Sequence, residues 1–227
     1  MDFLDPQQMF YLVMVAPVLL LSLTVHEFAH ARTALAFGDP TARAMGRVSL
    51  NPLVHLDPIG TLVLLVTQRI GWAKPVPVNP LNLQPRRLGD IMVSLAGPMS
   101  NLLLAILAGV LLRVVTHFEA DLGEKAATTL LTILWITMSC NVGLCVFNLI
   151  PLFPLDGHHI AREMLPPDRH ADFMRWQLKY GRLILLALIL LPMAVQNVGQ
   201  IRVISPIRLV HGSLMGLLQR LLGLPPL

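Results

Sequence analysis

Long runs of apolar residues alternate with short polar stretches along most of this chain. The four longest runs cover residues 9–25, 91–115, 126–152 and 183–198. A transmembrane helix needs about 20 mainly apolar residues, which the first three runs provide and the fourth reaches with its flanking residues. The pattern therefore predicts an all-α polytopic membrane protein with about four transmembrane helices.

The C-terminal stretch, residues 207–224, has a different pattern. Its apolar residues recur at helical spacing, and Arg208, Gln219 and Arg220 fall largely on the other side. An amphipathic helix at the membrane surface and a fifth, partly buried segment both fit this pattern.

Composition supports the membrane assignment. Of the 227 residues, 55% are hydrophobic and only 13% are charged, whereas a soluble domain has about 25% charged residues. The length predicts a single membrane-embedded domain over residues 1–227. The net charge of +4 is too small and too dispersed to indicate a nucleic-acid partner. The two cysteines, Cys140 and Cys145, lie in an apolar run and cannot form a disulfide framework.

The distribution of basic residues predicts an orientation. Seven Lys or Arg residues lie between residues 32 and 87, and five lie between residues 162 and 182. The first eight residues have none, and the stretch 116–125 is mainly acidic. Because basic loops favour the cytoplasmic side, we expect a multi-pass protein of a prokaryotic cell membrane with its N-terminus outside.

The sequence HEFAH at residues 26–30 is an HExxH motif. On a helix, His26 and His30 lie on one face about one turn apart, so both imidazoles can bind one zinc ion. Glu27 is then placed to take a proton from water at the metal. The alternative is a structural pair of histidines, but three ionisable residues in a membrane helix are expensive unless they serve a function.

A catalytic zinc site needs a third protein ligand. Asp156 is the main candidate, because the four-helix topology places it at the same depth as the histidines. It follows two prolines in the sequence NLIPLFPLDG at residues 148–157, which end the third helix. Its alternative role is that of a cytoplasmic turn residue. His158 and His159 could also bind metal, but we expect them to be solvated loop residues.

Together these motifs resemble the site-2 protease family of intramembrane zinc metalloproteases. The resemblance rests on HEFAH at the end of one membrane helix, AGPMSN at residues 96–101 and NLIPLFPLDG at residues 148–157. Residues 51–61 and 71–80 are also similar to segments of the small prokaryotic members. The resemblance covers residues 9–160 well and the remainder loosely.

The resemblance implies that the protein hydrolyses peptide bonds within or near transmembrane segments of membrane proteins. It implies one Zn²⁺ per chain with His26, His30 and Asp156 as ligands, Glu27 as the general base, and Asn148 holding the substrate near the metal. The site would lie near the cytoplasmic face. The loop at residues 116–125 is too short for the PDZ domain that the better-known members contain.

Substrate binding predicts a further element. Residues 62–66, Val76 and Val78 favour strands, and Pro75 and Pro77 would mark an edge that cannot donate hydrogen bonds. With the resemblance, this predicts a short membrane-associated β-hairpin over residues 60–79 that receives an unwound substrate through Val76 and Val78. The alternative is an amphipathic loop.

Some alternatives stay open at this level. Asn101 and Asn141 are polar groups within membrane helices, and each could serve helix packing or support the site. A catalytically silent zinc protein that binds helices and a metal transporter are the other function classes. Glu27 argues against the first of them, and the absence of sequence repeats argues against the second. The substrates and the oligomeric state are not indicated.

Overall fold

The computed structural model describes residues 6–67, 71–196 and 206–224. These residues contain helices and no strand longer than a single bridge. The elements are α1 (Pro6–Ala36), α2 (Thr41–Ala44), η1 (Pro52–Val54), α3 (Pro58–Thr67), α4 (Arg86–His117), α5 (Glu119–Leu122), α6 (Glu124–Asn148), α7 (Asp156–Met164), η2 (Pro167–Arg169), α8 (His170–Trp176), η3 (Gln177–Gly181), α9 (Arg182–Gln196) and α10 (Pro206–Leu221).

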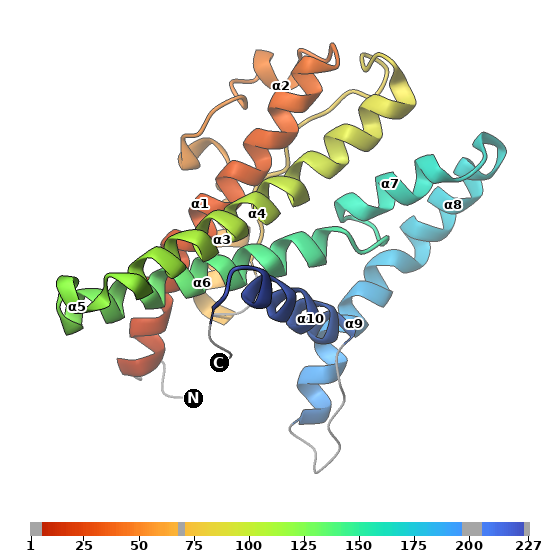
Figure 1. Cartoon of the computed structure of the whole chain (residues 1–227). Helices are drawn as coiled ribbons and strands as arrows, with labels where there is room; N and C mark the ends of the chain where they lie inside the picture. Colours follow the sequence, from red (N-terminus) through yellow and green to blue (C-terminus); the bar gives the residue numbers. More distant parts are fainter. Residues whose placement is uncertain (1–5, 68–70, 197–205, 225–227) are drawn as a thin grey trace.

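Three helices form the centre of the molecule. Among the described residues, three segments are long and apolar enough to cross a membrane, namely Val13–Ala36 in α1, all of α4 and all of α6. The helices α4 and α6 run antiparallel through the turn at α5, and α1 packs against both of them (Figure 1). This confirms a helical, multi-pass membrane protein.

The fourth predicted span begins in α9. This helix has 15 residues and ends at Gln196. Residues 197 and 198 of the predicted run lie outside the described part. The fourth span therefore stays a prediction, although the other three are confirmed.

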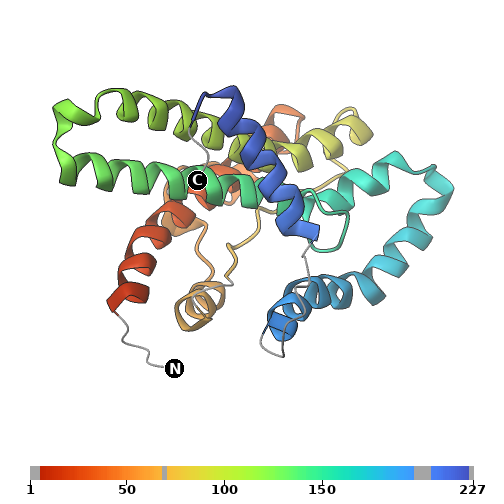
Figure 2. The same ribbon diagram turned by 60° about the horizontal axis from the view of Figure 1, so that its bottom comes forward.

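The C-terminal helix α10 lies across α4 and α6 (Figure 2). Its Met215 and Leu218 are buried in one apolar cluster with Ala105 and Met138. A Cβ on Gly109 would lie 2.4 Å from a methyl carbon of Leu222, so glycine at this position lets the C-terminal segment approach α4. Of the two readings of this stretch, the partly buried segment is the one that the structure supports.

The predicted β-hairpin over residues 60–79 is wrong. Residues 62–66 lie in α3, residues 71–79 are extended, and the pairing found here among the described residues is one isolated bridge between Leu56 and Ala73. Residues 68–70 lie outside the described part. A helix-start signal explains the error: the carboxylate of Asp57 accepts the N–H of Gly60, and Pro58 occupies the first position of α3. These signals outweigh the strand preference of valine and leucine.

Candidate metal centre

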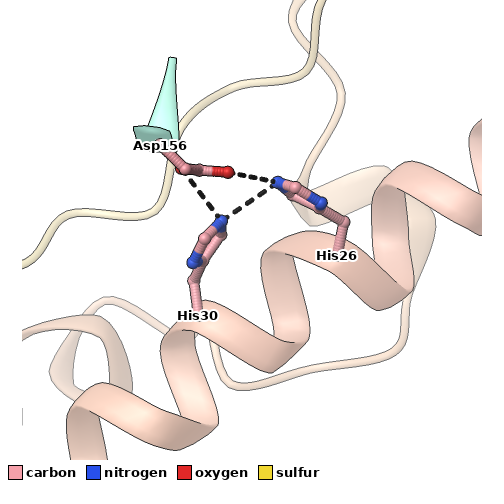
Figure 3. A group of neighbouring side chains, drawn as sticks. All are labelled: His26, His30 and Asp156. Atoms are coloured by element: carbon pink, nitrogen blue, oxygen red, sulfur yellow. Dashed lines mark hydrogen bonds and ion pairs between the residues drawn. The ribbon is translucent and has the colours of Figure 1, made fainter. Parts of the chain in front are cut away.

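The two histidines of HExxH project from one face of α1 (Figure 3). Both side chains are buried, with residue exposures of 4% for His26 and 7% for His30. Their Nε2 atoms lie 3.0 Å apart. The helical spacing predicted from the sequence therefore brings the two imidazoles to one point.

Asp156 reaches the same point from a different part of the chain (Figure 3). The helix α6 ends at Asn148, a loop with two prolines follows, and Asp156 is the first residue of α7. Its Oδ2 lies 3.3 Å from Nε2 of His26, and its Oδ1 lies 3.4 Å from Nε2 of His30. The three predicted ligands are therefore neighbours, at the end of the bundle where α1 and α6 end and α4 begins.

Hydrogen bonds on the far side of each ring fix the orientation of both histidines. Nδ1 of His26 lies 2.6 Å from Oδ1 of Asn101, and Nδ1 of His30 lies 2.7 Å from the carbonyl oxygen of Val93. A carbonyl oxygen only accepts, so each Nδ1 carries the proton and donates it. Each neutral ring therefore presents the lone pair of Nε2 to the centre, which is the form that binds a metal.

The partner of His26 belongs to a buried polar network. The amide of Asn101 also donates to Oδ1 of Asn141 at 2.9 Å and to the carbonyl of Ser22 at 3.3 Å. Asn141 in turn donates to the hydroxyl of Ser22 at 2.8 Å. The network thus joins α1, α4 and α6 directly behind one proposed ligand. Of the two roles left open for Asn101, direct support of the site is the one that the contacts favour.

The three side chains fit a zinc ion. Tetrahedral zinc with bonds of about 2.0–2.1 Å places its ligand atoms roughly 3.3 Å apart. Here the two Nε2 atoms lie 3.0 Å apart, and each lies 3.3 or 3.4 Å from the nearer carboxylate oxygen of Asp156. Oδ2 of Asp156 is buried without a hydrogen-bond partner. A Cβ on Gly97 would lie 2.4 Å from Nε2 of His30 and 2.6 Å from Nε2 of His26, so glycine is needed to leave room here.

The electrostatics of Asp156 agree with this arrangement. Burial alone would raise the pKa of its carboxyl group, but the adjacent imidazoles of His30 and His26, when protonated, outweigh it and hold the pKa well below its ordinary value. The group is therefore an anion over the whole physiological range. With the two imidazoles in their neutral form, this anionic carboxylate and the two Nε2 lone pairs are a set of ligands that zinc binds.

Glu27 is half-buried and has a main-chain partner. Its Oε2 accepts the N–H of Val76 at 2.9 Å. Since Pro75 and Pro77 have no N–H, Val76 is the single main-chain donor of this Pro-Val-Pro stretch. The candidate base and the extended segment that the sequence singled out therefore touch each other.

The extended segment is anchored on both sides of Val76. The buried Arg47 donates to the carbonyls of Lys74 and Pro75. The N–H of Asn79 donates to Oδ2 of Asp39 at 2.7 Å. These contacts hold the segment along α1, from the site to the end of the helix.

The remaining candidates lie farther from the centre. The amide of Asn148 donates back to the carbonyl of Leu144 on its own helix at 3.0 Å. Val78 packs against the cluster of Ala34, Leu83 and Val93. The structure therefore places Asn148 and Val78 on neighbouring elements, with partners other than the three ligands.

The expectation for His158 was wrong. Its residue exposure is 2%, and its Nδ1 lies 2.6 Å from the carbonyl of Leu155, so it closes the first turn of α7 instead of facing solvent. His159 is more exposed and lies 3.7 Å from a carboxylate oxygen of Asp90.

Sequence reasoning missed the ion pair that joins α7 to α4. Asp90 of α4 is buried, and Arg162 of α7 pairs with both Asp90 and Glu163. The pair with Asp90 holds α7, and with it Asp156, against α4. The signal was present, because a carboxylate at the start of a membrane helix demands a partner, but the sequence alone does not identify that partner.

Comparison with known proteins agrees with this centre. The profile of Peptidase family M50 matches residues 111–191, which include Asp156. "Putative zinc metalloprotease YwhC" of Bacillus subtilis (strain 168) is 41% identical over 175 residues, which are 77% of this chain and 79% of that protein. No solved structure shows a significant match.

Two mycobacterial relatives extend the match. "Putative zinc metalloprotease Rip2" of Mycolicibacterium smegmatis is 33% identical over 76% of this chain and 65% of that protein. The protein of the same name from Mycobacterium tuberculosis (strain H37Rv) is 32% identical over 69% of this chain and 59% of its own length. With its helical membrane fold and its His-His-Asp centre, the chain belongs to peptidase family M50, the site-2 protease family, and is an intramembrane zinc metalloprotease.

Proposed function

We propose that this zinc metalloprotease hydrolyses peptide bonds within or next to the transmembrane segments of membrane proteins. His26, His30 and Asp156 bind the zinc, and Glu27 is the general base. The observation that carries the proposal is the meeting of three side chains, whose nearest ligand atoms lie 3.0–3.4 Å apart in each pair, in a chain with three membrane-spanning segments. Ionisable side chains at membrane depth are energetically unfavourable, so a cluster of them indicates a functional site.

The chemistry follows from the groups present. Zinc at this site would polarise the scissile carbonyl and lower the pKa of the attacking water toward 7 or so. The carboxylate of Glu27 accepts one proton from that water, the hydroxide oxygen bonds to the carbonyl carbon, and the C–N bond breaks. Glu27 passes its proton to the leaving amine nitrogen as this C–N bond breaks, so the free carboxylate is regenerated.

An apolar cavity of about 680 Å³ supplies a route for the substrate. Its walls come from α1, α3, α6, α9 and the extended segment, and include Leu23, Thr24, Trp72, Leu144 and Phe147. Thr24 lies two residues before His26, and Phe147 directly precedes Asn148. An apolar cavity beside the site suits a membrane-spanning segment better than it suits a soluble peptide.

Three further residues are proposed to contact the substrate. Asn148 lies between the cavity and the loop of Asp156, where its amide could turn from Leu144 to a substrate carbonyl. Val76 and Val78 belong to the extended segment beside Glu27, so a substrate that reaches the base passes along their main chain. The support for these roles is the position of the three residues beside the cavity and the base.

The proposed location is a prokaryotic cell membrane, with the N-terminus outside and the site near the cytoplasmic face. The support is the excess of Lys and Arg at residues 32–87 and 162–182. Membrane-impermeant labelling of single cysteines tests it. Cysteines at Arg86 and Arg169 should label from the cytoplasm, and one at Asp121 should label from outside. Cytoplasmic labelling at Asp121 would reverse the orientation.

The test of the activity compares intact protein with Glu27→Gln in cells. The amide cannot accept the proton from water, so turnover should fall by about 10²–10⁴-fold while zinc binding is retained. Comparison of membrane-protein fragments across the proteome should reveal substrates that accumulate uncut with the variant. Near-normal turnover of Glu27→Gln would reject Glu27 as the base. Unaltered fragment patterns together with loss of soluble-peptide cleavage would reject membrane substrates.

A further inference from the structure

The loop that precedes Asp156 does not satisfy all of its main-chain hydrogen-bonding groups by itself. It runs over residues 149–155 between α6 and α7 and contains two prolines, which cannot donate hydrogen bonds. The N–H groups of Leu152 and Leu155 bond within the loop, to Ile150 and Leu152. These local turns leave the carbonyl of Pro151 and the N–H of Phe153 for a partner from elsewhere.

One side chain, Gln177, satisfies both groups. Its Oε1 accepts the N–H of Phe153 at 2.9 Å, and its Nε2 donates to the carbonyl of Pro151 at 2.8 Å. Gln177 lies more than 20 residues beyond Asp156 along the chain, and its residue exposure is 1%. Each end of the amide therefore holds one main-chain group of the loop, and the side chain that does so is itself buried.

The local backbone is shaped around this amide. Residues Gln177–Gly181 form the π-helical turn η3 between α8 and α9, and such turns are rare and occur frequently at functional sites. A Cβ on Gly181 would lie 2.7 Å from Oε1 of Gln177 and 3.3 Å from the N–H nitrogen of Phe153. Glycine is therefore required for the amide and the loop to meet.

Contacts on either side extend the same arrangement. The guanidinium of Arg182, next after η3, lies 4.8 Å from the ring centre of Phe153, a cation–π distance. His158 holds the carbonyl of Leu155, the residue before Asp156. The loop is thus fixed through residues 151 and 153 by one element and through residue 155 by another.

We propose that Gln177 is a positioning residue for the metal centre, which acts through the loop to set where the carboxylate of Asp156 meets His26 and His30. The inference rests on the proposed ligand role of Asp156. It adds a support from the segment after α7, in a position that no motif of the family resemblance covers. Residues that orient metal ligands typically change metal affinity by about 10–100-fold when they are replaced.

The experiment measures zinc affinity of the full-length protein in lipid nanodiscs, by competition with a chromogenic chelator. Gln177→Met keeps the length of the side chain and removes both hydrogen bonds. Gly181→Ala keeps Gln177 but pushes its amide away from Phe153. Lys179→Met, on the exposed side of the same turn, is the matched control. Cobalt(II) absorption reports the ligand geometry independently of activity.

We expect zinc affinity to fall by about 10–100-fold in Gln177→Met and in Gly181→Ala, with an altered cobalt spectrum and with Lys179→Met unchanged. Wild-type affinity and spectrum in both variants, even with a lower melting temperature, would show that Gln177 serves the fold alone and would overturn the inference. If Gln177→Met does not fold, Gly181→Ala decides. Wild-type affinity in Asp156→Ala would instead refute the ligand assignment under the proposed function.

Discussion

The two halves of the metal centre are held by different means. His26 and His30 come from one turn of α1, within a membrane-spanning segment, and their spacing is set by helix geometry. Asp156 follows a broken stretch of chain, and its place depends on contacts with segments far away in the sequence. A helical motif thus supplies two ligands almost by itself, whereas the third needs the rest of the fold.

The supports of the two halves differ accordingly. The helix half is backed by Asn101 and by the carbonyl of Val93, both on α4. The loop half is backed by the pair of Asp90 and Arg162 and by side chains that hold the loop itself. We therefore expect changes on α4 near Asn101 to affect the histidines, and changes near the loop to affect Asp156 while the histidine pair stays in place.

The largest expected effect is the loss of zinc when a ligand is removed. Wild-type protein should contain about one zinc per chain, and His26→Ala and Asp156→Ala should each lose nearly all of it, because two ligands are too few for a stable site. Metal content after dialysis measures this. His117→Ala, at the exposed far end of α4, is the control and should retain zinc.

The same pair of variants tests the comparison itself. His26→Ala leaves Oδ1 of Asn101 without its donor in a buried network, which should lower the free energy of unfolding by about 1–3 kcal/mol. Asp156→Ala removes a carboxylate that has no such network behind it, so its effect on stability should be smaller. Equal losses of stability, measured on metal-free protein, would mean that the two halves are supported alike.

A second, smaller effect is expected at Asn101. Asn101→Leu removes the acceptor that holds the ring of His26, so zinc affinity should fall by about 10–100-fold, as for other residues that orient ligands. Asn141→Leu lies one hydrogen bond farther from the imidazole and should cost less affinity. An equal or larger effect at Asn141 would show that the network acts through helix packing instead of through the ring.

Much of the helix half could be predicted from the sequence, for a physical reason. Membrane helices satisfy their own backbone, so apolar runs identify α4 and α6, and the spacing in HExxH follows from one helix. The boundaries were less accurate: α1 continues to Ala36, past the polar motif at which its apolar run stops. Polar residues that face protein interrupt an apolar pattern without ending the helix.

The loop half and the extended segment were harder to predict. The sequence indicated Asp156 as a ligand, but Asp90, Arg162 and Gln177 act through tertiary contacts that have no local pattern. The hairpin failed for a related reason, since the cap formed by Asp57 and Pro58 decided the structure of residues 58–67 against their strand preference. Side-chain capping is decisive where intrinsic preferences are weak.

A third prediction separates the base from the ligands. Val76→Pro removes the main-chain donor to Glu27, in a stretch where both neighbouring residues are already proline. A hydrogen bond to a charged group contributes about 1.5–3 kcal/mol, so turnover should fall by roughly tenfold or more while zinc affinity is unchanged. Val76→Ala retains the N–H and is the matched control. An equal fall in Val76→Ala would assign the effect to the side chain.

The smallest effect on the site is expected at Asp39, which anchors the far end of the segment through Asn79. This buried carboxylate accepts hydrogen bonds from Thr41, Asn79 and Asn82. Burial alone would raise its pKa, but these hydrogen bonds outweigh it and hold the pKa below its ordinary value. Asp39→Asn should therefore lower the free energy of unfolding by about 1.5–3 kcal/mol at pH 7 and change zinc affinity little.

The pH dependence gives the sharper form of this last test. A carboxyl group whose pKa is lowered by folding stabilises the folded state above its unfolded pKa of about 3.9, and that contribution is lost as the pH falls through the lower, folded pKa. The difference in stability between wild type and Asp39→Asn should thus be constant above about pH 5 and shrink below pH 4 or so. Other carboxylates titrate in both proteins and cancel in the difference. Asp172→Asn, at an exposed surface pair, should show almost no difference at any pH. A gap that persists unchanged into acid would mean that Asp39 acts through the shape of its side chain and not through its charge.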